Sequence, residues 1–375
     1  MKTLSMTALP MAASVALAFA LVAPVALAET AILAAPVVFA STGTYQQHNL
    51  VSDGFVAADH IDANLVNAWG VAFNPNGFVW VANADSGTST LYDGTGNPQS
   101  LVVNIPTPDA DSGGNPTGIV YNGSSGFMVT KGTVSGASRF LFATEQGLIA
   151  GWAPSVDGTH AIVAVNTANT SGAIFKGLAL SGSGSGQLLY ATDFHNGVVD
   201  IFDATFAPVT LPVNAFVDDR LPFGFAPFGI QAIGGDIYVT FARQDADKED
   251  EIAGAGQGVV DVFDPNGRLL QRVATRGALN APWGIALAPA GFGRLGGALL
   301  IGNFGDGHIN AYNPITNAFL GSLRGANHRP IEIFGLWGIA FGNGLAGQSV
   351  DSLFFASGPG GEDHGLYGRL DPVIN

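Results

Sequence analysis

A short apolar phrase built around a glycine recurs along the chain after residue 45. In four copies the residue before the glycine is aromatic, and two to four apolar residues usually follow it. The glycines of the six copies lie 48 to 59 residues apart, at positions 70, 118, 177, 229, 284 and 338. A period of about 50 residues is typical of the blades of a β-propeller. The pattern therefore predicts six blades.

Each copy contains several short apolar runs separated by Gly, Pro, Asn and Asp, which favour tight turns. In the first copy, the runs after Gly70 are Phe78–Asn83, Ser89–Tyr92 and Leu101–Ile105. The third copy predicts strands at Gly186–Thr192, Gly197–Phe202 and Pro208–Val213, and the fifth at Ala298–Gly302, His308–Tyr312 and Ala318–Leu323. Apolar residues with helical spacing are confined to the start of the chain. We therefore expect an all-β protein, a six-bladed β-propeller of four-stranded antiparallel blades.

The last copy holds only three runs, Trp337–Phe341, Ser352–Ala356 and Leu366–Leu370. The segment Tyr45–Val51 precedes the first blade and has strand character. We predict that it pairs beside Leu366–Leu370 as the missing outer strand, because this closure would remove a free sheet edge. Residues 45–375 would then form a single propeller domain.

Two copies carry insertions. Residues Gly123–Ser138 are predicted to add a hairpin to the second blade. In the fourth blade, Ala242–Gly258 separates the second and third strands and is acidic, with Asp245, Asp247, Glu249, Asp250 and Glu251 beside Arg243 and Lys248. Such a run is typical of a solvated loop. Calcium binding is the alternative, although an EF-hand loop would need Gly where Asp250 stands.

The first 28 residues have the order of a secretory signal peptide: Lys2, an apolar run, and the small residues of Ala26–Ala28. Cleavage is expected between Ala28 and Glu29, followed by a flexible segment over 29–44. An uncleaved membrane anchor is the alternative. No later segment has 18 consecutive apolar residues, so we expect no membrane span after cleavage. The protein is expected to be exported, to the periplasm or the cell exterior.

Composition narrows the classes of function. The chain has 375 residues, 52 of them Gly, with 11% charged residues, a net charge of -15 and no cysteine. This charge disfavours nucleic-acid binding, which needs clustered Lys and Arg. Disulfides and Cys-ligated metals are excluded. Glycine at this frequency suits many tight turns and inner strands that approach a narrow axis.

The order of strands in each predicted blade indicates where a binding site would lie. In a four-stranded meander, the loop entering strand one and the loop from strand two to strand three lie on the same face, so these loops would surround one channel mouth. The ligand-binding candidates in them are Asn67, Asn83, Asp85, Asp193, His195, Arg243, Asn303 and Asp306. Asn and Asp also favour turns and cap backbone amides for structural reasons alone.

Three of these residues, Asn83, Asp193 and Asn303, end the second strand of their blades. They are the candidates for a metal site holding Ca²⁺ or another divalent cation, with His195 as the catalytic candidate for a base. No cofactor is assigned beyond that. No Gly-x-Ser-x-Gly, phosphate-loop or His-Glu-x-x-His motif occurs. The aromatic residues before the repeat glycines suit packing between blades or, alternatively, a ligand platform.

The phrases Trp69–Pro75, Val79–Asn83 and Ala281–Ala286 resemble NHL-type propeller repeats. Together with the opening Tyr45–Gly54, they are similar to a family of uncharacterised exported bacterial propellers, many of which carry a C-terminal PEP-CTERM tail. This chain ends at Asp371–Asn375 without that tail. The resemblance implies no established activity.

Two functions are therefore expected. The first is a noncatalytic binding module that takes an unknown small molecule, polymer or protein at one channel mouth. The second is a metal-dependent hydrolase or lyase of the six-bladed propeller type. Nucleic acid is not expected as a partner, and we expect a monomer.

Overall fold

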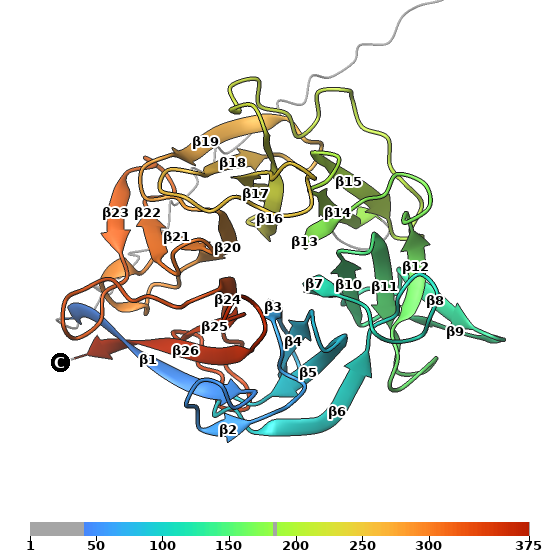
Figure 1. Cartoon of the computed structure of the whole chain (residues 1–375), viewed down its shortest axis with the longest axis horizontal. Helices are drawn as coiled ribbons and strands as arrows, with labels where there is room; N and C mark the ends of the chain where they lie inside the picture. The colour runs from blue at the N-terminus through green and yellow to red at the C-terminus, as the bar shows by residue number, and fades with distance from the viewer. Residues whose placement is uncertain (1–40, 183–185, 375) are drawn as a thin grey trace, which may run out of the picture. The chain divides into compact units, whose positions relative to one another are not determined.

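The computed structural model describes residues 41–182 and 186–374. Six sheets surround one central channel, as Figure 1 shows. The fold class predicted from the repeats is confirmed. The predicted signal peptide, its cleavage site and residues 29–40 of the expected flexible segment lie outside the described residues. None of the helices in the described part of the chain has the length and hydropathy needed to cross a membrane.

The first strand of each blade lies next to the channel, and neighbouring strands of a blade pair antiparallel except for β1 and β2 of blade six, which pair parallel. Blade one contains β3 (Ala68–Phe73), β4 (Val79–Asn83), β5 (Thr88–Tyr92) and β6 (Pro98–Asn104). Blade two contains β7 (Pro116–Tyr121), β10 (Phe140–Thr144), β11 (Leu148–Trp152) and β12 (Ile162–Asn166). Blade three contains β13 (Phe175–Ser181), β14 (Leu188–Asp193) and β15 (Val198–Asp203).

The remaining blades follow the same order. Blade four contains β16 (Phe225–Ile233), β17 (Asp236–Arg243), β18 (Val259–Phe263) and β19 (Leu269–Thr275). Blade five contains β20 (Pro282–Leu287), β21 (Leu299–Asn303), β22 (Ile309–Tyr312) and β23 (Phe319–Ser322), with a short 3-10 helix, η2 (Gly293–Leu295), between its first two strands. Blade six contains β24 (Leu336–Phe341), β25 (Leu353–Ser357), β26 (Leu366–Ile374), β1 (Ser41–Ser52) and β2 (His60–Ile61).

The same aspartate turn joins the third and fourth strands of blades one and four. Asp93 accepts the backbone N–H groups of Thr95 and Asn97 at 2.8 and 3.0 Å. Asp264 accepts those of Asn266 and Arg268 at 2.9 and 3.0 Å. These bonds satisfy amides that would otherwise be unpaired at the turn. The turn residues read from the sequence therefore act through their side chains as well as their backbone.

The repeat glycines allow the inner strands to approach one another. A Cβ at Gly70 would lie 2.5 Å from the carbonyl oxygen of Thr117 in the next blade. A Cβ at Gly338 would lie 2.4 Å from that of Trp69, across the junction where the ring closes. Any larger residue would force the blades apart. Glycine at these positions is therefore a packing requirement, as the sequence predicted.

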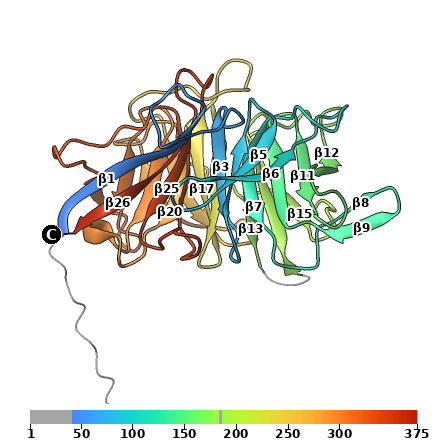
Figure 2. The same ribbon diagram turned by 90° about the horizontal axis from the view of Figure 1, so that it is seen from below.

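Blade six is closed by the N-terminal strand. β1 pairs antiparallel with β26, with Tyr45 opposite Pro372 and Ser52 opposite Leu366, and the two strands run side by side in Figures 1 and 2. This confirms the predicted pairing. The strand begins at Ser41, so residues 41–44 belong to it rather than to a flexible segment.

The predicted insertion in blade two is a hairpin of β8 (Met128–Lys131) and β9 (Val134–Ala137), which projects from the rim in Figures 1 and 2. The prediction of a fourth strand at Pro208–Val213 is wrong, because blade three has three strands. Only a single bridge between Phe202 and Pro208 marks its start. Pro208 and Pro212 lack the N–H groups that a strand needs, and Val213 is exposed.

Candidate functional site

Aromatic side chains fill the channel at the level where the inner strands begin. Trp69 and Trp337, each directly before a repeat glycine, stack with ring centroids 3.4 Å apart. Trp283 meets them edge-on at 6.0 and 5.8 Å, and Phe228 packs against Trp337 at 5.7 Å. All four are buried, so they form a core on the axis and offer no open platform to a ligand.

Lys176 occupies the corresponding position of blade three and brings a charge into this layer, whereas blade two has Thr117 there. Its side chain is 1% exposed. Its Nζ donates to Oε1 of Glu145 at 2.5 Å and to Oδ1 of Asp250 at 3.0 Å. The same Nζ lies 5.4 Å from the centroid of the Trp69 ring, within the range of a cation–π interaction. A charged ammonium group is thus held among aromatic rings at the propeller axis.

Carboxyl groups from four blades surround this lysine. We call the channel end that they form the acidic mouth, and its carboxyl groups are those of Asp85, Glu145, Asp250, Glu251 and Glu362. They follow the second strands of blades one, two, four and six. At full ionisation the acidic mouth would carry five negative charges against the one positive charge of Lys176.

The insertion of blade four brings two of these carboxyl groups to the mouth. Gln244 and Glu251 bridge in antiparallel fashion, and the N–H of Asp245 donates to the carbonyl of Asp250 at 2.8 Å. The Gln244 amide also donates to the carbonyl of His195 at 3.3 Å. These bonds fold the insertion into a small hairpin anchored to blade three. An insertion expected as a solvated loop therefore has a fixed position over the mouth.

Two opposing effects determine the pKa of Lys176. Burial lowers it, but the negative charges of Glu145, Glu251 and Asp250 outweigh burial and leave the pKa above its ordinary value. Burial raises the pKa of Glu251 to about 8, and the charges of Glu362 and Asp250 add to this against the attraction of Lys176. Lys176 is therefore charged at neutral pH, whereas Glu251 is largely protonated.

Glu362 has a similar environment. Burial raises its pKa to about 7, the hydrogen bond from Asn67 opposes this, and the charge of Glu145 adds to it. The pKa of Asp85 is also raised, first by burial and then by the charges of Glu145 and Asp363, against a hydrogen bond from Asn67. The mouth thus holds more negative charge than Lys176 neutralises.

Two of the residues predicted from the sequence meet at this mouth. Asn67 accepts the indole N–H of Trp69 at 2.9 Å and donates to Oε2 of Glu362 at 3.1 Å and to Oδ1 of Asp85 at 3.4 Å. It therefore links the aromatic layer to the carboxyl groups. The backbone φ of Asn67 is +47°, a conformation that Asn tolerates better than most residues.

The three residues suggested as metal ligands do not come together. Asn83 donates to the hydroxyls of Thr88 and Thr90 at 3.1 and 3.0 Å within blade one. Asp193 accepts the N–H of Ile174 at 3.3 Å and that of Asn196 at 3.1 Å in blade three.

Asn303 lies in blade five, where it donates to the carbonyl of Ala278 at 2.8 Å and to Oδ1 of Asp306 at 3.0 Å. Each of the three thus makes local hydrogen bonds in a different blade, and Oδ1 of Asn83 and Oδ1 of Asn303 are buried without a hydrogen-bond partner among the described residues. Among residues 41–182 and 186–374, no three His, Asp or Glu side chains are grouped so that they could hold a metal ion.

The remaining candidates lie around these loops. Asp306 also accepts the amide of Asn280 at 3.3 Å and the N–H of His308 at 3.1 Å. His195 is half-buried, and its Nδ1 has no hydrogen-bond partner among the described residues. Arg243 is exposed at the end of β17.

Sequence reasoning missed Lys176 and Glu145, and it treated Asp250 and Glu251 as a loop or a calcium site. The available signal was the position of Lys176: it stands directly before a repeat glycine, where four other copies have an aromatic residue. A lysine in an otherwise buried aromatic position indicates a partner of opposite charge.

Two uncharacterized proteins of Acanthamoeba polyphaga mimivirus are similar to this chain. One is 34% identical over 302 residues, which cover 79% of this chain and 74% of the relative. The other is 31% identical over 348 residues, covering 89% and 88%. The chain belongs to the family of these mimivirus proteins. The relatives found are thus viral, whereas the sequence pattern led us to expect a relationship to exported bacterial proteins. No family model matches this chain.

Solved propellers share the fold of this family at low identity. A streptogramin B lyase aligns with a TM-score of 0.51 and 14% identity, over 88% of this chain and 97% of that one. The soluble aldose sugar dehydrogenase from Escherichia coli, in its apo form, aligns with a TM-score of 0.51 and 12% identity, over 88% and 100%. These likenesses establish the fold alone.

Proposed function

We propose that the protein is a noncatalytic binding module that recognises an organic cation, such as a polyamine or another molecule with several ammonium groups, at the acidic mouth. The observation that carries this proposal is the surplus of carboxyl groups around Lys176. Burial and the neighbouring carboxylates raise the pKa values of Glu251 and Glu362 to about 8 and 7, and the single charge of Lys176 only partly opposes this. A cationic ligand would supply that charge and displace the protons.

The ligand class follows from the spacing of the carboxyl groups. They come from four blades, and no three of them are grouped for a single metal ion within the described residues. An extended molecule with separated positive charges matches this arrangement better than one compact ion. The side chain of Asp250 is 74% exposed, so part of the mouth is open to solvent.

A buried ion cluster on the axis also needs an explanation beyond stability. Ion pairs removed from water seldom stabilise a fold more than well-packed apolar side chains would. Four of the other five blades fill the same position with Trp or Phe, which pack together. Retaining Lys176 and its carboxyl partners at this level is therefore consistent with a binding role.

Calorimetric titration tests the proposal. We expect spermidine to bind at pH 7 with release of protons, seen as a dependence of the heat on the ionisation enthalpy of the buffer. Glu251→Gln and Glu362→Gln should each weaken binding at least about fivefold, which corresponds to about 1 kcal/mol. Glu249→Gln, an exposed position in the same loop, is the matched control and should bind normally. Absence of spermidine binding, or equal losses in all three variants, would refute the proposal.

The metal-dependent hydrolase or lyase is the second candidate that the sequence suggested. A parallel titration with Ca²⁺ and Mg²⁺ separates it from the first, because tight binding of a divalent cation that Asp193→Ala abolishes would favour the metal site. Export remains a proposal, supported by the signal-like order of residues 1–28, and cell fractionation of the full chain tests it.

A further inference from the structure

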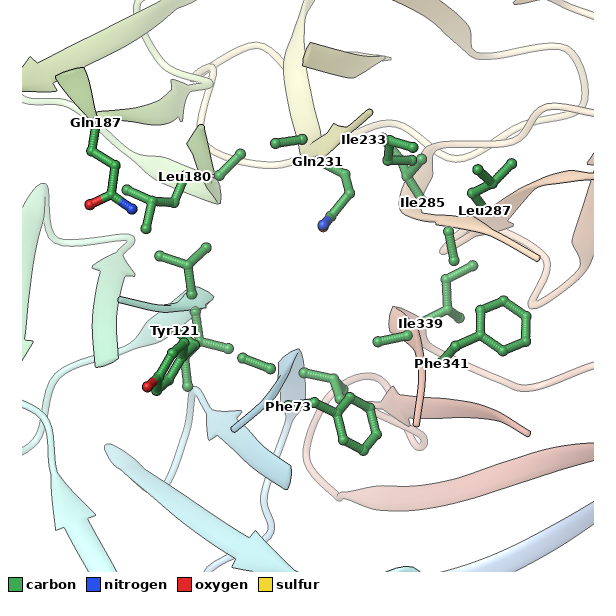
Figure 3. A pocket seen from close by; sticks show the side chains of 18 residues that line it. Phe73, Tyr121, Leu180, Gln187, Gln231, Ile233, Ile285, Leu287, Ile339 and Phe341 are labelled. Atoms are coloured by element: carbon green, nitrogen blue, oxygen red, sulfur yellow. The ribbon is translucent and has the colours of Figure 1, made fainter. Parts of the chain in front are cut away.

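The opposite end of the channel holds a cavity of about 510 Å³. It is lined by the last residues of the six inner strands, β3, β7, β13, β16, β20 and β24, together with Gln187. The strands begin at the acidic mouth and end at this cavity, so the two sites occupy opposite ends of the axis. Figure 3 shows the lining side chains arranged around an open centre.

The aromatic layer closes the cavity at its inner end. Trp69, Phe228 and Trp337 fill the channel where the inner strands begin, and each is at most 1% exposed. A molecule that enters between the strand ends would therefore meet a closed base. The cavity is a blind pocket, which we call the channel pocket.

The lining of the channel pocket carries no charge. Its 18 residues are aliphatic or aromatic except for Gln187 and Gln231, and none of them is acidic or basic. In Figure 3 the amide of Gln231 points into the open centre. A charged ligand group would lose water here without gaining a charged partner, which is costly. An apolar ligand gains from burial against the same walls.

Backbone groups add hydrogen-bonding capacity. Each inner strand is the terminal strand of its sheet, so it is paired along one edge only. The other edge, on the channel side in Figure 1, presents N–H and C=O groups that have no partner in the sheet. The channel pocket therefore combines apolar side chains with neutral donors and acceptors.

We propose that the channel pocket binds an uncharged small molecule with an apolar body and a carbonyl, hydroxyl or aromatic amine group that hydrogen-bonds to the Gln231 amide. Its volume lies within the range of pockets that hold small ligands, about 300–1,000 Å³. This site is independent of the acidic mouth, because it differs in position and in charge.

Two fluorescent probes of nearly the same shape test this proposal. N-phenyl-1-naphthylamine is uncharged, and 8-anilino-1-naphthalenesulfonate is its sulfonated relative. We expect the uncharged probe to bind with a 1:1 stoichiometry and at least about tenfold more tightly than the sulfonate. Equal binding of the two probes, or no binding of the uncharged one, would overturn the proposal.

Variants locate the probe. Leu287 lines the channel pocket and is 45% exposed, whereas Leu320 lies on β23 outside it and is 48% exposed. Leu287→Arg should weaken binding of the uncharged probe at least tenfold, and the matched Leu320→Arg should leave it unchanged. Gln231→Glu, which adds a charge without adding bulk, should weaken it at pH 8. Spermidine binding should survive in all three variants, and equal effects of the two arginine substitutions would show that the probe binds elsewhere.

Discussion

The hydroxyl of Tyr45 donates a hydrogen bond to the carbonyl of Phe292, 3.1 Å away, and accepts one from the N–H of Leu295 at 3.2 Å. The two aromatic rings pack with centroids 4.6 Å apart. Tyr45 belongs to the closing strand β1, whereas Phe292 and Leu295 belong to blade five. The closing strand is therefore fixed to the neighbouring blade as well as to its own sheet.

Tyr45→Phe removes both hydrogen bonds while it keeps the ring. We expect the free energy of unfolding to fall by about 1–3 kcal/mol, since the buried carbonyl of Phe292 and the partly buried N–H of Leu295 lose their partner. Urea denaturation measures this loss. The hydroxyl of Tyr121 has no hydrogen-bond partner within the described residues. Tyr121→Phe is therefore the control. Similar losses in both variants would show that the contact contributes nothing.

Lys176→Met keeps most of the side-chain volume and removes the charge. The carboxylates of Glu145 and Asp250 then lose their partner, and we expect destabilisation of about 1–3 kcal/mol at pH 8. At pH 5 the loss should be smaller, because the unpaired carboxyl groups can be protonated. Adding Glu145→Gln should recover part of the stability at pH 8. A loss independent of pH would indicate a packing defect instead.

The raised pKa values of Glu251 and Glu362 predict that stability falls as pH rises. The folded chain holds the Glu251 proton up to about pH 8, while an unfolded chain loses it near its ordinary value of 4.5. Between these values the folded state binds more protons, so its free energy of unfolding decreases with pH. For Glu362 the same window ends at about pH 7.

Thermal unfolding between pH 5 and 8 checks this. Tm should decline over that range, and Glu251→Gln should raise Tm at pH 8 by about 2 °C or more and flatten the profile. Glu249→Gln should leave the profile unchanged. A Tm that rises from pH 5 to 8 and is unaffected by Glu251→Gln would contradict the assignment.

Asp193 is expected to stabilise its blade. Asp193→Ala leaves the N–H groups of Ile174 and Asn196 without their acceptor, which should cost about 1–3 kcal/mol in urea denaturation. Asp193→Asn keeps an acceptor and should lose less. An undiminished stability in Asp193→Ala, together with a loss of Ca²⁺ binding, would restore the metal-site hypothesis.

The fold could be predicted from the sequence because its signal repeats. Glycines such as Gly70 and Gly338 recur at the same place in each copy because neighbouring inner strands approach closely there. The last copy has one strand too few, and this predicted the role of β1. The prediction of a fourth strand in blade three was wrong because Pro208 and Pro212 lack the N–H groups that a strand needs, although the run is apolar. The acidic mouth was only partly predictable: the loops identified the face, but the meeting of Lys176 with Asp250 depends on how one insertion folds across the ring.

The pairing of β1 with β26 has a consequence for synthesis of the chain. Ser41–Ser52 leaves the ribosome before any blade, yet its partner Leu366–Ile374 is made only after all the others. Throughout elongation the early strand must remain unpaired, with its edge groups exposed to other chains. Contacts this distant in sequence also form slowly. The step that completes the ring is therefore the one in which a nascent chain is most exposed to aggregation, and a chaperone that covers the early strand would be most useful at that step.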